Sequence, residues 1–192
     1  FVGSITAAGA TLKAAGKETI YIPASAMYPT TTHGCAELTQ VELATPADAE
    51  SLKPELKCLD FDPSADENAQ FTVAFPKSWN ENVITFKAYF TVSGTDTGTV
   101  SWSLAGVSCA DNDAINASLG TAVAPTAKAH SGASGDVNVT AESGNVTIAG
   151  SPSTDELVFF NVRRDVSADS QTGDARLLGI QIFFTTDAAN DA

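Results

Sequence analysis

Basic residues are scarce in this chain. Its 192 residues include 10 Lys and Arg against 23 Asp and Glu, which gives a formal net charge of -13 at pH 7. A surface of this charge repels the phosphates of nucleic acids and the headgroups of anionic membranes. The composition therefore argues against nucleic acid as a partner, and the acidity is typical of a surface that keeps a protein soluble.

Long hydrophobic runs are also missing. No apolar stretch approaches the roughly 20 residues that a membrane-spanning helix needs, so we expect no membrane insertion. Cysteine is limited to Cys35, Cys58 and Cys109, and none of them has the paired spacing of a zinc ribbon. The odd number leaves two arrangements open. One is a disulfide with a free thiol, and the other, which we favour, is three buried free thiols that pack as small hydrophobic groups.

Alternation of apolar and polar residues predicts strands along most of the chain. The clearest case is residues 71–92, where Phe71 and Phe75 share one face of a strand and Phe86 and Phe90 share one face of the next. Successive side chains of a strand point to opposite sides, so this period of two indicates half-buried strands. A polar turn separates the two runs. The stretch is therefore interpreted as the central hairpin of a β-sandwich.

The remaining periodic segments predict an all-β fold: a jelly-roll-like antiparallel β-sandwich. Strands are expected over residues 18–23, 36–43, 99–108, 155–164 and 175–185, with a short hairpin formed by 136–140 and 145–149. One short helix is expected over residues 111–119, which Asp111 would cap and Gly120 would end. Residues 1–17 are rich in Ala, Gly and Thr and are interpreted as an arm or linker. Residues 18–192 then form a single domain.

Two strands are apolar on both faces in places, as in the run from Leu157 to Phe160 and in residues 175–185. The outer face of a two-layer sandwich should be polar, so the outward apolar side chains require another surface to cover them. We therefore predict a homo-oligomer, with a trimer as the preferred state.

No catalytic motif surrounds the two histidines, His33 and His130, and the chain lacks the HExxH and GxSxG patterns. A nucleophilic pair would require Cys35 or Cys109 beside one of these histidines, and the sequence does not place them together. We therefore predict a non-enzymatic protein without a cofactor, and assign no catalytic or cofactor-binding residues.

An acidic turn contains Asp60, Asp62 and Asp66, whose oxygens are the type of ligand that calcium prefers. The turn lacks the glycine of an EF-hand loop and contains Pro63. A solvated turn is the favoured interpretation, and ion binding there is left open.

Three arginines lie at the ends of the last two long strands. For Arg163, Arg164 and Arg176 we favour salt bridges with Asp165 and Asp174 over contacts with an anion or a sugar acid. Three aromatic residues are candidates for stacking on sugar rings, unless they belong to the core or to an interface: Tyr28, Trp79 and Tyr89.

Several blocks of the sequence resemble a family of tailed-bacteriophage proteins that is common in marine and environmental phages. The blocks are IPASAMYPTTTHGC (22–35), LDFDPSADENAQFTVAFPKSWNE (59–81), TIAGSPSTDELVFFNVRRD (147–165) and DARLLGIQIFFTTDAAND (174–191). The similarity covers nearly the whole chain from about Ile20. Some members are described as tail fibre or virion structural proteins, and the resemblance transfers no catalytic or binding residues.

The resemblance implies a protein of the virion surface and leaves three hypotheses. The first is a trimeric module of a tail fibre or spike that contacts host-surface glycans. The second is a capsid decoration protein, of the cement or head-fibre type, whose N-terminal arm docks on other virion proteins. The third and least favoured is a polysaccharide depolymerase, which requires paired carboxylates across a cleft.

Overall fold

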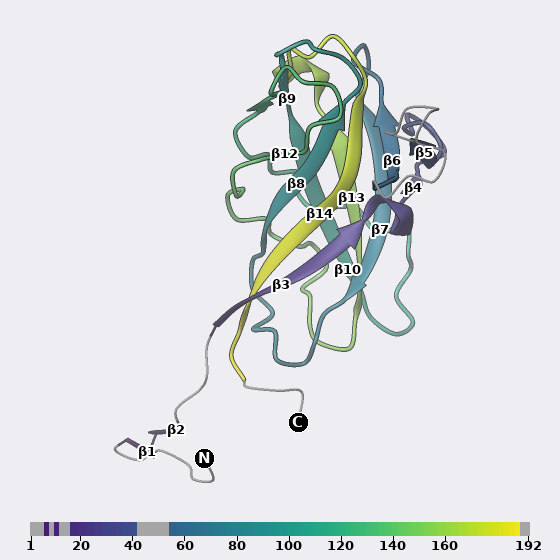
Figure 1. Cartoon of the computed structure of the whole chain (residues 1–192). Coiled ribbons are helices and arrows are strands. Elements are labelled where there is room, and N and C mark those ends of the chain that lie inside the picture. Colours follow the sequence, from purple (N-terminus) through teal and green to yellow (C-terminus); the bar gives the residue numbers. More distant parts are fainter. Residues whose placement is uncertain (1–5, 8–9, 12–15, 42–53, 189–192) are drawn as a thin grey trace.

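The computed structural model describes residues 6–7, 10–11, 16–41 and 54–188, and the structural statements below concern these residues. They fold as a jelly-roll-like antiparallel β-sandwich, which confirms the predicted fold class (Figure 1). Two short strands, β1 (Thr6–Ala7) and β2 (Ala10–Thr11), pair with each other. No helix in these ranges is both long enough and apolar enough to cross a membrane.

The larger sheet is organised around its longest strand, β14. The strand order is β12-β8-β14-β6-β5, and β3 also pairs with β14. Its strands are β3 (Gly16–Pro23), β5 (Thr39–Val41), β6 (Leu56–Phe61), β8 (Thr85–Val92), β12 (Asn138–Val139) and β14 (Ala175–Thr186). Along one side β14 pairs with β8, and along the other it pairs first with β6 and then with β3. The register with β8 shifts between Leu177 and Gly179, where β14 contains a β-bulge.

The smaller sheet has the order β10-β13-β7-β4. Its strands are β4 (Tyr28–Pro29), β7 (Glu67–Ala74), β10 (Trp102–Cys109) and β13 (Leu157–Arg164). Two more short strands, β9 (Thr99–Val100) and β11 (Lys128–Ala129), pair with each other. The helical turns are the two 3-10 segments η1 (Ala24–Ala26) and η2 (Val166–Ala168).

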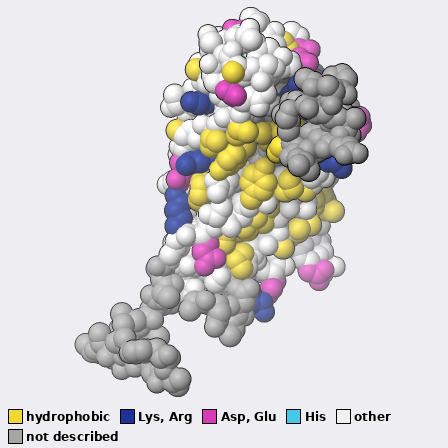
Figure 2. All heavy atoms as spheres, in the orientation of Figure 1, with side chains coloured by type: hydrophobic (Ala, Val, Ile, Leu, Met, Phe, Trp, Pro, Cys, Tyr) yellow, Lys and Arg dark blue, Asp and Glu magenta, His cyan; other side chains and the backbone are white. Residues whose placement is uncertain are grey.

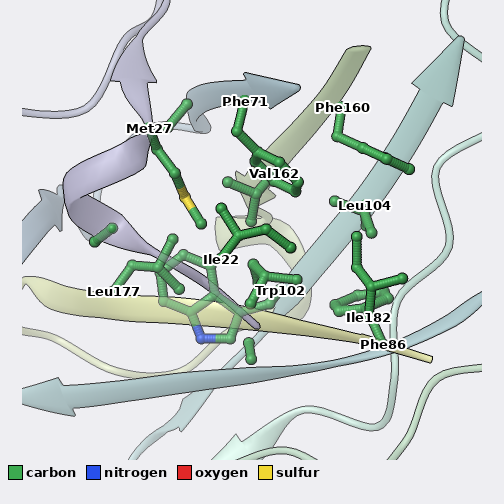
Figure 3. Packing of buried hydrophobic residues seen from close by; sticks show 14 of the residues in the cluster. Ile22, Met27, Phe71, Phe86, Trp102, Leu104, Phe160, Val162, Leu177 and Ile182 are labelled. Carbon is green, nitrogen blue, oxygen red and sulfur yellow. The ribbon is translucent and has the colours of Figure 1, made fainter. Parts of the chain in front are cut away.

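The core lies between the two sheets, and both contribute side chains to it. Figure 3 shows Phe86 and Ile182 of the larger sheet facing the space that Leu104 and Phe160 of the smaller sheet also occupy. Phe86 and Phe160 alternate with less buried neighbours along β8 and β13, as the sequence pattern predicts, whereas every residue of β10 is buried. Trp102 is fully buried, and its ring meets that of Phe61 edge to face at 4.9 Å between centroids.

The predicted central hairpin is wrong, although both of its strands exist. β7 pairs with β13 and β4 in the smaller sheet, whereas β8 pairs with β14 and β12 in the larger one. The connection between them carries buried apolar side chains, among them Phe75, Trp79 and Ile84. Phe75 stacks on Trp79 at 4.3 Å between ring centroids. Because these anchors hold the connection against the core, the chain changes sheet here instead of turning back on itself.

The predicted hairpin within residues 136–149 is also wrong. This segment runs along the free edge of β8, where the backbone N–H groups of Thr140 and Ser143 donate to the carbonyls of Ala88 and Phe86 at 3.1 and 2.9 Å. The hydroxyls of the same two residues accept hydrogen bonds from the N–H groups of Ala88 and Phe86, each at 3.0 Å. The segment therefore satisfies the edge of β8 rather than pairing with itself.

The helix expected over residues 111–119 is absent, and turns take its place. Asn112 has φ 68, a left-handed conformation that interrupts a helix. The Asp113 carboxylate accepts a hydrogen bond from the Ala110 N–H at 3.0 Å, which closes a local turn. The segment is exposed throughout, so no packed face offsets the entropy of ordering a short helix.

The sandwich begins slightly earlier in the chain than predicted. β3 starts at Gly16, and Lys17 pairs with Thr185 in the sheet, so these two residues of the expected arm are part of the larger sheet. The rest of the expected arm lies outside the described residues, apart from β1 and β2. All three cysteines are buried free thiols, which is the arrangement favoured from the sequence.

Candidate functional site

Three neighbouring strands, β3, β14 and β8, form the outer face of the larger sheet (Figure 1). Their register places Tyr21, Gln181 and Lys87 in one row across the three strands, because cross-strand partners share a face. Figure 2 shows hydrophobic side chains gathered in the middle of this side of the molecule. We call the outer face of these three strands the aromatic face and define it by Lys17, Tyr21, Lys87, Tyr89, Gln181 and Phe183.

Tyr21 lies across β14 at a position where only glycine fits. A Cβ atom on Gly179 would lie 2.4 Å from the Tyr21 hydroxyl oxygen and 2.6 Å from its Cζ atom. The hydroxyl donates to the carbonyl of Leu178, the extra residue of the β-bulge, at 3.2 Å. The ring meets Tyr89 edge to face, with centroids 5.7 Å apart. The bulge and the glycine thus bring aromatic rings from β3 and β8 together over β14.

Polar groups around these rings are fixed by hydrogen bonds to neighbouring groups. The Tyr89 hydroxyl donates to Oε1 of Gln181 at 2.9 Å, which fixes the orientation of the amide. Burial, followed by the nearby Tyr89, raises the pKa of the Tyr21 hydroxyl, so this group stays a neutral donor at ordinary pH. Tyr21 nevertheless remains 49% exposed. The face therefore combines fixed polar groups with an accessible ring.

Two lysines lie near the third ring of the face. Nζ of Lys17 is 4.8 Å from the centroid of Phe183, and Nζ of Lys87 is 5.8 Å from it. Lys17 also pairs with the Glu142 carboxylate, which accepts a hydrogen bond from the Thr85 hydroxyl as well. The bonds from Lys17 and Thr85 hold the pKa of Glu142 below its usual range. This cluster contains two ammonium groups and one carboxylate, so it is locally positive on an acidic chain.

The three aromatic residues considered for sugar stacking from the sequence lie in different parts of the structure. Tyr28 is exposed on the outer face of the smaller sheet, and Tyr89 belongs to the aromatic face. Trp79 is 2% exposed and belongs to the core, which is one of the alternatives left open from the sequence. Tyr21 and Phe183 were missed. The available signal was the alternation in ETIYIP, which points Tyr21 away from the core-facing Ile22.

The acidic turn does not assemble its carboxylates around one point. Asp60 pairs with Arg176 at 3.3 Å, and Asp62 accepts from a backbone N–H two residues later at 2.6 Å. Asp66 pairs with Arg163 at 3.3 Å. Within the described ranges, no group of three or more His, Cys, Asp or Glu side chains is placed to hold a metal ion.

The arginines form salt bridges, as favoured from the sequence, but only partly with the expected partners. Arg163 pairs with Asp165 at 3.3 Å, which confirms that assignment. Arg164 is fully buried and pairs with Asp169 at 2.9 Å. No ion pair found in the described ranges includes Asp174. Alternation along β13 explains the difference, because it turns Arg164 inward and Arg163 outward.

The Cys35 thiol is a poor nucleophile in this fold. Burial, with a smaller contribution from Glu67, raises the pKa of Cys35 from its ordinary value of 9.0 to about 12. A thiol with this pKa is protonated at neutral pH, and the thiolate is the reactive form. His130 is buried, with Nδ1 2.8 Å from the carbonyl oxygen of Asp96. None of the hydrogen bonds found in the described ranges joins a cysteine to a histidine.

No family model matches the chain, and no curated protein shows significant sequence similarity. Among solved structures, Caldicellulosiruptor saccharolyticus CBM27-1 in complex with mannohexaose is 10% identical, with a TM-score of 0.40 over 91% of this chain and 99% of that chain. TmCBM61 in complex with β-1,4-galactotriose is 8% identical, with a TM-score of 0.29 over 89% of this chain and 88% of that chain. Similarity at this level carries no information on ligands.

Proposed function

We propose that this chain is a non-enzymatic structural protein of a tailed-phage virion surface. In this proposal it is a module of a tail fibre or spike, and it contacts host-surface glycans through the aromatic face. The phage assignment rests on the sequence blocks that resemble phage virion proteins. The glycan assignment rests on one observation: the rings of Tyr21, Tyr89 and Phe183 share the outer face of the larger sheet with fixed polar groups.

The chemistry of the face suits a sugar ring. The C–H bonds of a saccharide carry a small positive charge, and the face of an aromatic ring carries a negative quadrupole, so the two attract each other when stacked. Sugar hydroxyls require donors and acceptors nearby, which Gln181 and the lysines supply. Because Tyr89 already holds the Gln181 amide in place, binding would require little further ordering of side chains.

The same face is less suited to an interface between copies of the chain. Lysine is depleted in the buried centre of protein interfaces, because its ammonium group is strongly hydrated. Lys17 and Lys87 both lie within 6 Å of the Phe183 ring centroid, at 4.8 and 5.8 Å. A glycan leaves these ammonium groups in contact with water, whereas a packed protein surface would desolvate them. The predicted trimer would therefore use surface outside the aromatic face.

Immunogold labelling of intact phage particles tests where this protein lies on the virion. Gold on tail appendages is the expected result. Gold over the head would favour the decoration hypothesis, and particles without gold would refute a virion protein altogether.

Affinity electrophoresis tests the ligand, in gels that contain surface polysaccharide from the bacterium that the phage infects. We expect the polysaccharide to retard the intact protein, and Tyr21→Ala and Phe183→Ala to weaken the retardation. Ile115→Ala is the control, because Ile115 is 68% exposed in a turn outside the aromatic face. Equal retardation of all four proteins would refute the aromatic face as the binding surface. Cleavage of the polysaccharide would favour the depolymerase hypothesis.

A further inference from the structure

The outer face of the smaller sheet carries an open hollow that the aromatic face does not involve. Its volume is about 660 Å³, and most of its lining side chains are polar. They include His33, Asp66, Asn68, Arg163 and Ser167. These residues come from the loop after β4, the turn before β7, the strands β7 and β13, and η2. Segments far apart in the sequence therefore build one depression.

The charged groups of the hollow are already paired. Arg163 is 3.3 Å from Asp66 through Nη1 and 3.3 Å from Asp165 through Nη2. Asp66 is held in turn by the backbone N–H of Val166 at 3.0 Å. The buried Nε of Arg163 has no hydrogen-bond partner in the described part of the chain. One guanidinium against two carboxylates makes this cluster locally negative, so it disfavours an anionic ligand.

A row of side-chain amides leads into the hollow. Gln70 donates to Asn161 at 3.5 Å, and Asn161 donates to Asn68 at 2.8 Å. Asn68 donates to the carbonyl of His33 at 3.2 Å. Each amide has two N–H donors and an oxygen with two lone pairs, and each of these contacts uses one donor. The row therefore presents further donors and acceptors in fixed orientations.

An exposed aromatic ring lies at the other end of this row. Tyr28 of β4 is the register partner of Gln70 in β7, and Gln70 is also the partner of Asn161 in β13. The three side chains therefore share the outer face of the smaller sheet. Neighbouring strands are about 4.8 Å apart, so the row spans about 10 Å from β4 to β13. Tyr28 is 49% exposed, so its ring is accessible to a ligand.

We propose that this second face, defined by Tyr28, Gln70, Asn161, Asn68 and the hollow around Arg163, binds an uncharged saccharide. A sugar hydroxyl both donates and accepts hydrogen bonds, and the amide row supplies both kinds of partner. A sugar ring would stack on Tyr28, and a neighbouring unit would place its hydroxyls against Asp66 and Arg163. The surplus negative charge selects against uronic acids and sulfated sugars. The site is independent of the aromatic face, because the two lie on opposite outer faces of the sandwich.

Nuclear magnetic resonance of the ¹⁵N-labelled protein tests the proposal. The probes are neutral oligosaccharides of glucose, galactose or mannose, with oligogalacturonate as the acidic comparison. With at least one neutral probe we expect saturable shifts in the side-chain amide signals of Gln70 and Asn161 and in the Nε–H signal of Arg163. Tyr28→Ala should weaken that binding about tenfold, which corresponds to about 1.4 kcal/mol. Tyr21→Ala is the matched control, since Tyr21 is also 49% exposed but lies on the aromatic face.

The outcomes separate the two faces. The proposal is supported if signals of the second face shift with an affinity that Tyr28→Ala lowers and Tyr21→Ala leaves unchanged. This holds whether or not the aromatic face also binds the probe. Absence of saturable shifts there with all neutral probes overturns it. Unchanged affinity in Tyr28→Ala, or tighter binding of oligogalacturonate than of any neutral probe, overturns it as well. Shifts confined to the aromatic face support the proposed function and refute the second site.

Discussion

Replacing Arg164 with Gln should strongly destabilise the fold. Arg164 is fully buried, and all five N–H donors of its guanidinium group are used. Two of them reach the carboxylate of Asp169, at 2.9 Å from Nε and 3.1 Å from Nη2. The other three reach the carbonyls of Phe61, Gln171 and Gly173, at 2.8, 2.9 and 3.0 Å. One side chain thus joins β6, β13 and the loop that follows β13.

The expected magnitude follows from what the substitution leaves behind. The Asp169 side chain is 2% exposed, so without its cation it becomes an uncompensated buried charge. Breaking one half of a buried ion pair typically costs about 3–5 kcal/mol. Domains of this kind have total stabilities of about 5–15 kcal/mol, so the loss is a large fraction of the whole. With a urea dependence of about 2 kcal/mol per molar, the unfolding midpoint should fall by about 2 M.

The shift in the unfolding midpoint is measured by urea titration with tryptophan fluorescence as the signal. Trp102 is buried and is the register partner of Arg164 in β10, so its emission should report the loss of packing there. Arg163→Gln is the matched control, because it makes the same substitution at the next residue. Its ion pairs involve side chains that are 23–40% exposed, and such pairs contribute at most about 1 kcal/mol. If both variants unfold at the same urea concentration, the reasoning about the buried network is refuted.

Four further predictions concern the core, a thiol and the assembly. Phe90→Ala should cost about 3–5 kcal/mol by the same urea assay, because Phe90 is fully buried against Trp102, and an unmoved midpoint would contradict this packing. Cys35 should resist thiol reagents at pH 8 in the native protein and react once urea unfolds it; rapid native labelling would contradict its burial. Its pKa of about 12 in the folded state, against 9.0 ordinarily, also predicts that its contribution to stability holds below pH 9 and is lost as pH rises through 12. Sedimentation equilibrium should give a trimer mass at micromolar concentration, and a monomer mass would contradict the predicted oligomer.

The strands were predictable because a period of two is a local signal. It correctly identified β7, β8, β13 and β14 to within a few residues. The pairing of those strands was not predictable from the same signal, because alternation indicates which side chains share a face and not which strand lies alongside. Consequently, β7 and β8 were taken as a hairpin, although the buried Trp79 between them holds the connection to the core.

The aromatic face was predictable only in part. Alternation turns Lys87 and Tyr89 outward, and this was visible in the sequence. The approach of Tyr21 to Tyr89 depends on the pairing of β3 with β14, which joins residues from opposite ends of the chain. It also depends on Gly179, whose lack of a side chain leaves room for the Tyr21 ring. No local sequence pattern indicates that an aromatic ring packs over this glycine. The burial of Arg164 was easier to predict from the sequence, since alternation places this residue on the same side of β13 as Val162.

The two proposed binding faces restrict how copies of this chain can assemble. The aromatic face has two ammonium groups near one carboxylate, whereas the second face has one guanidinium near two carboxylates. Because the sheets lie back to back, a trimer that packed through either outer face would bury one of these clusters. An assembly that keeps both faces accessible must therefore use the edges or ends of the sandwich. Acylation of Lys87 in the intact oligomer tests whether the aromatic face is open, since a lysine at a packed interface reacts slowly and one on an open face reacts as it does in water.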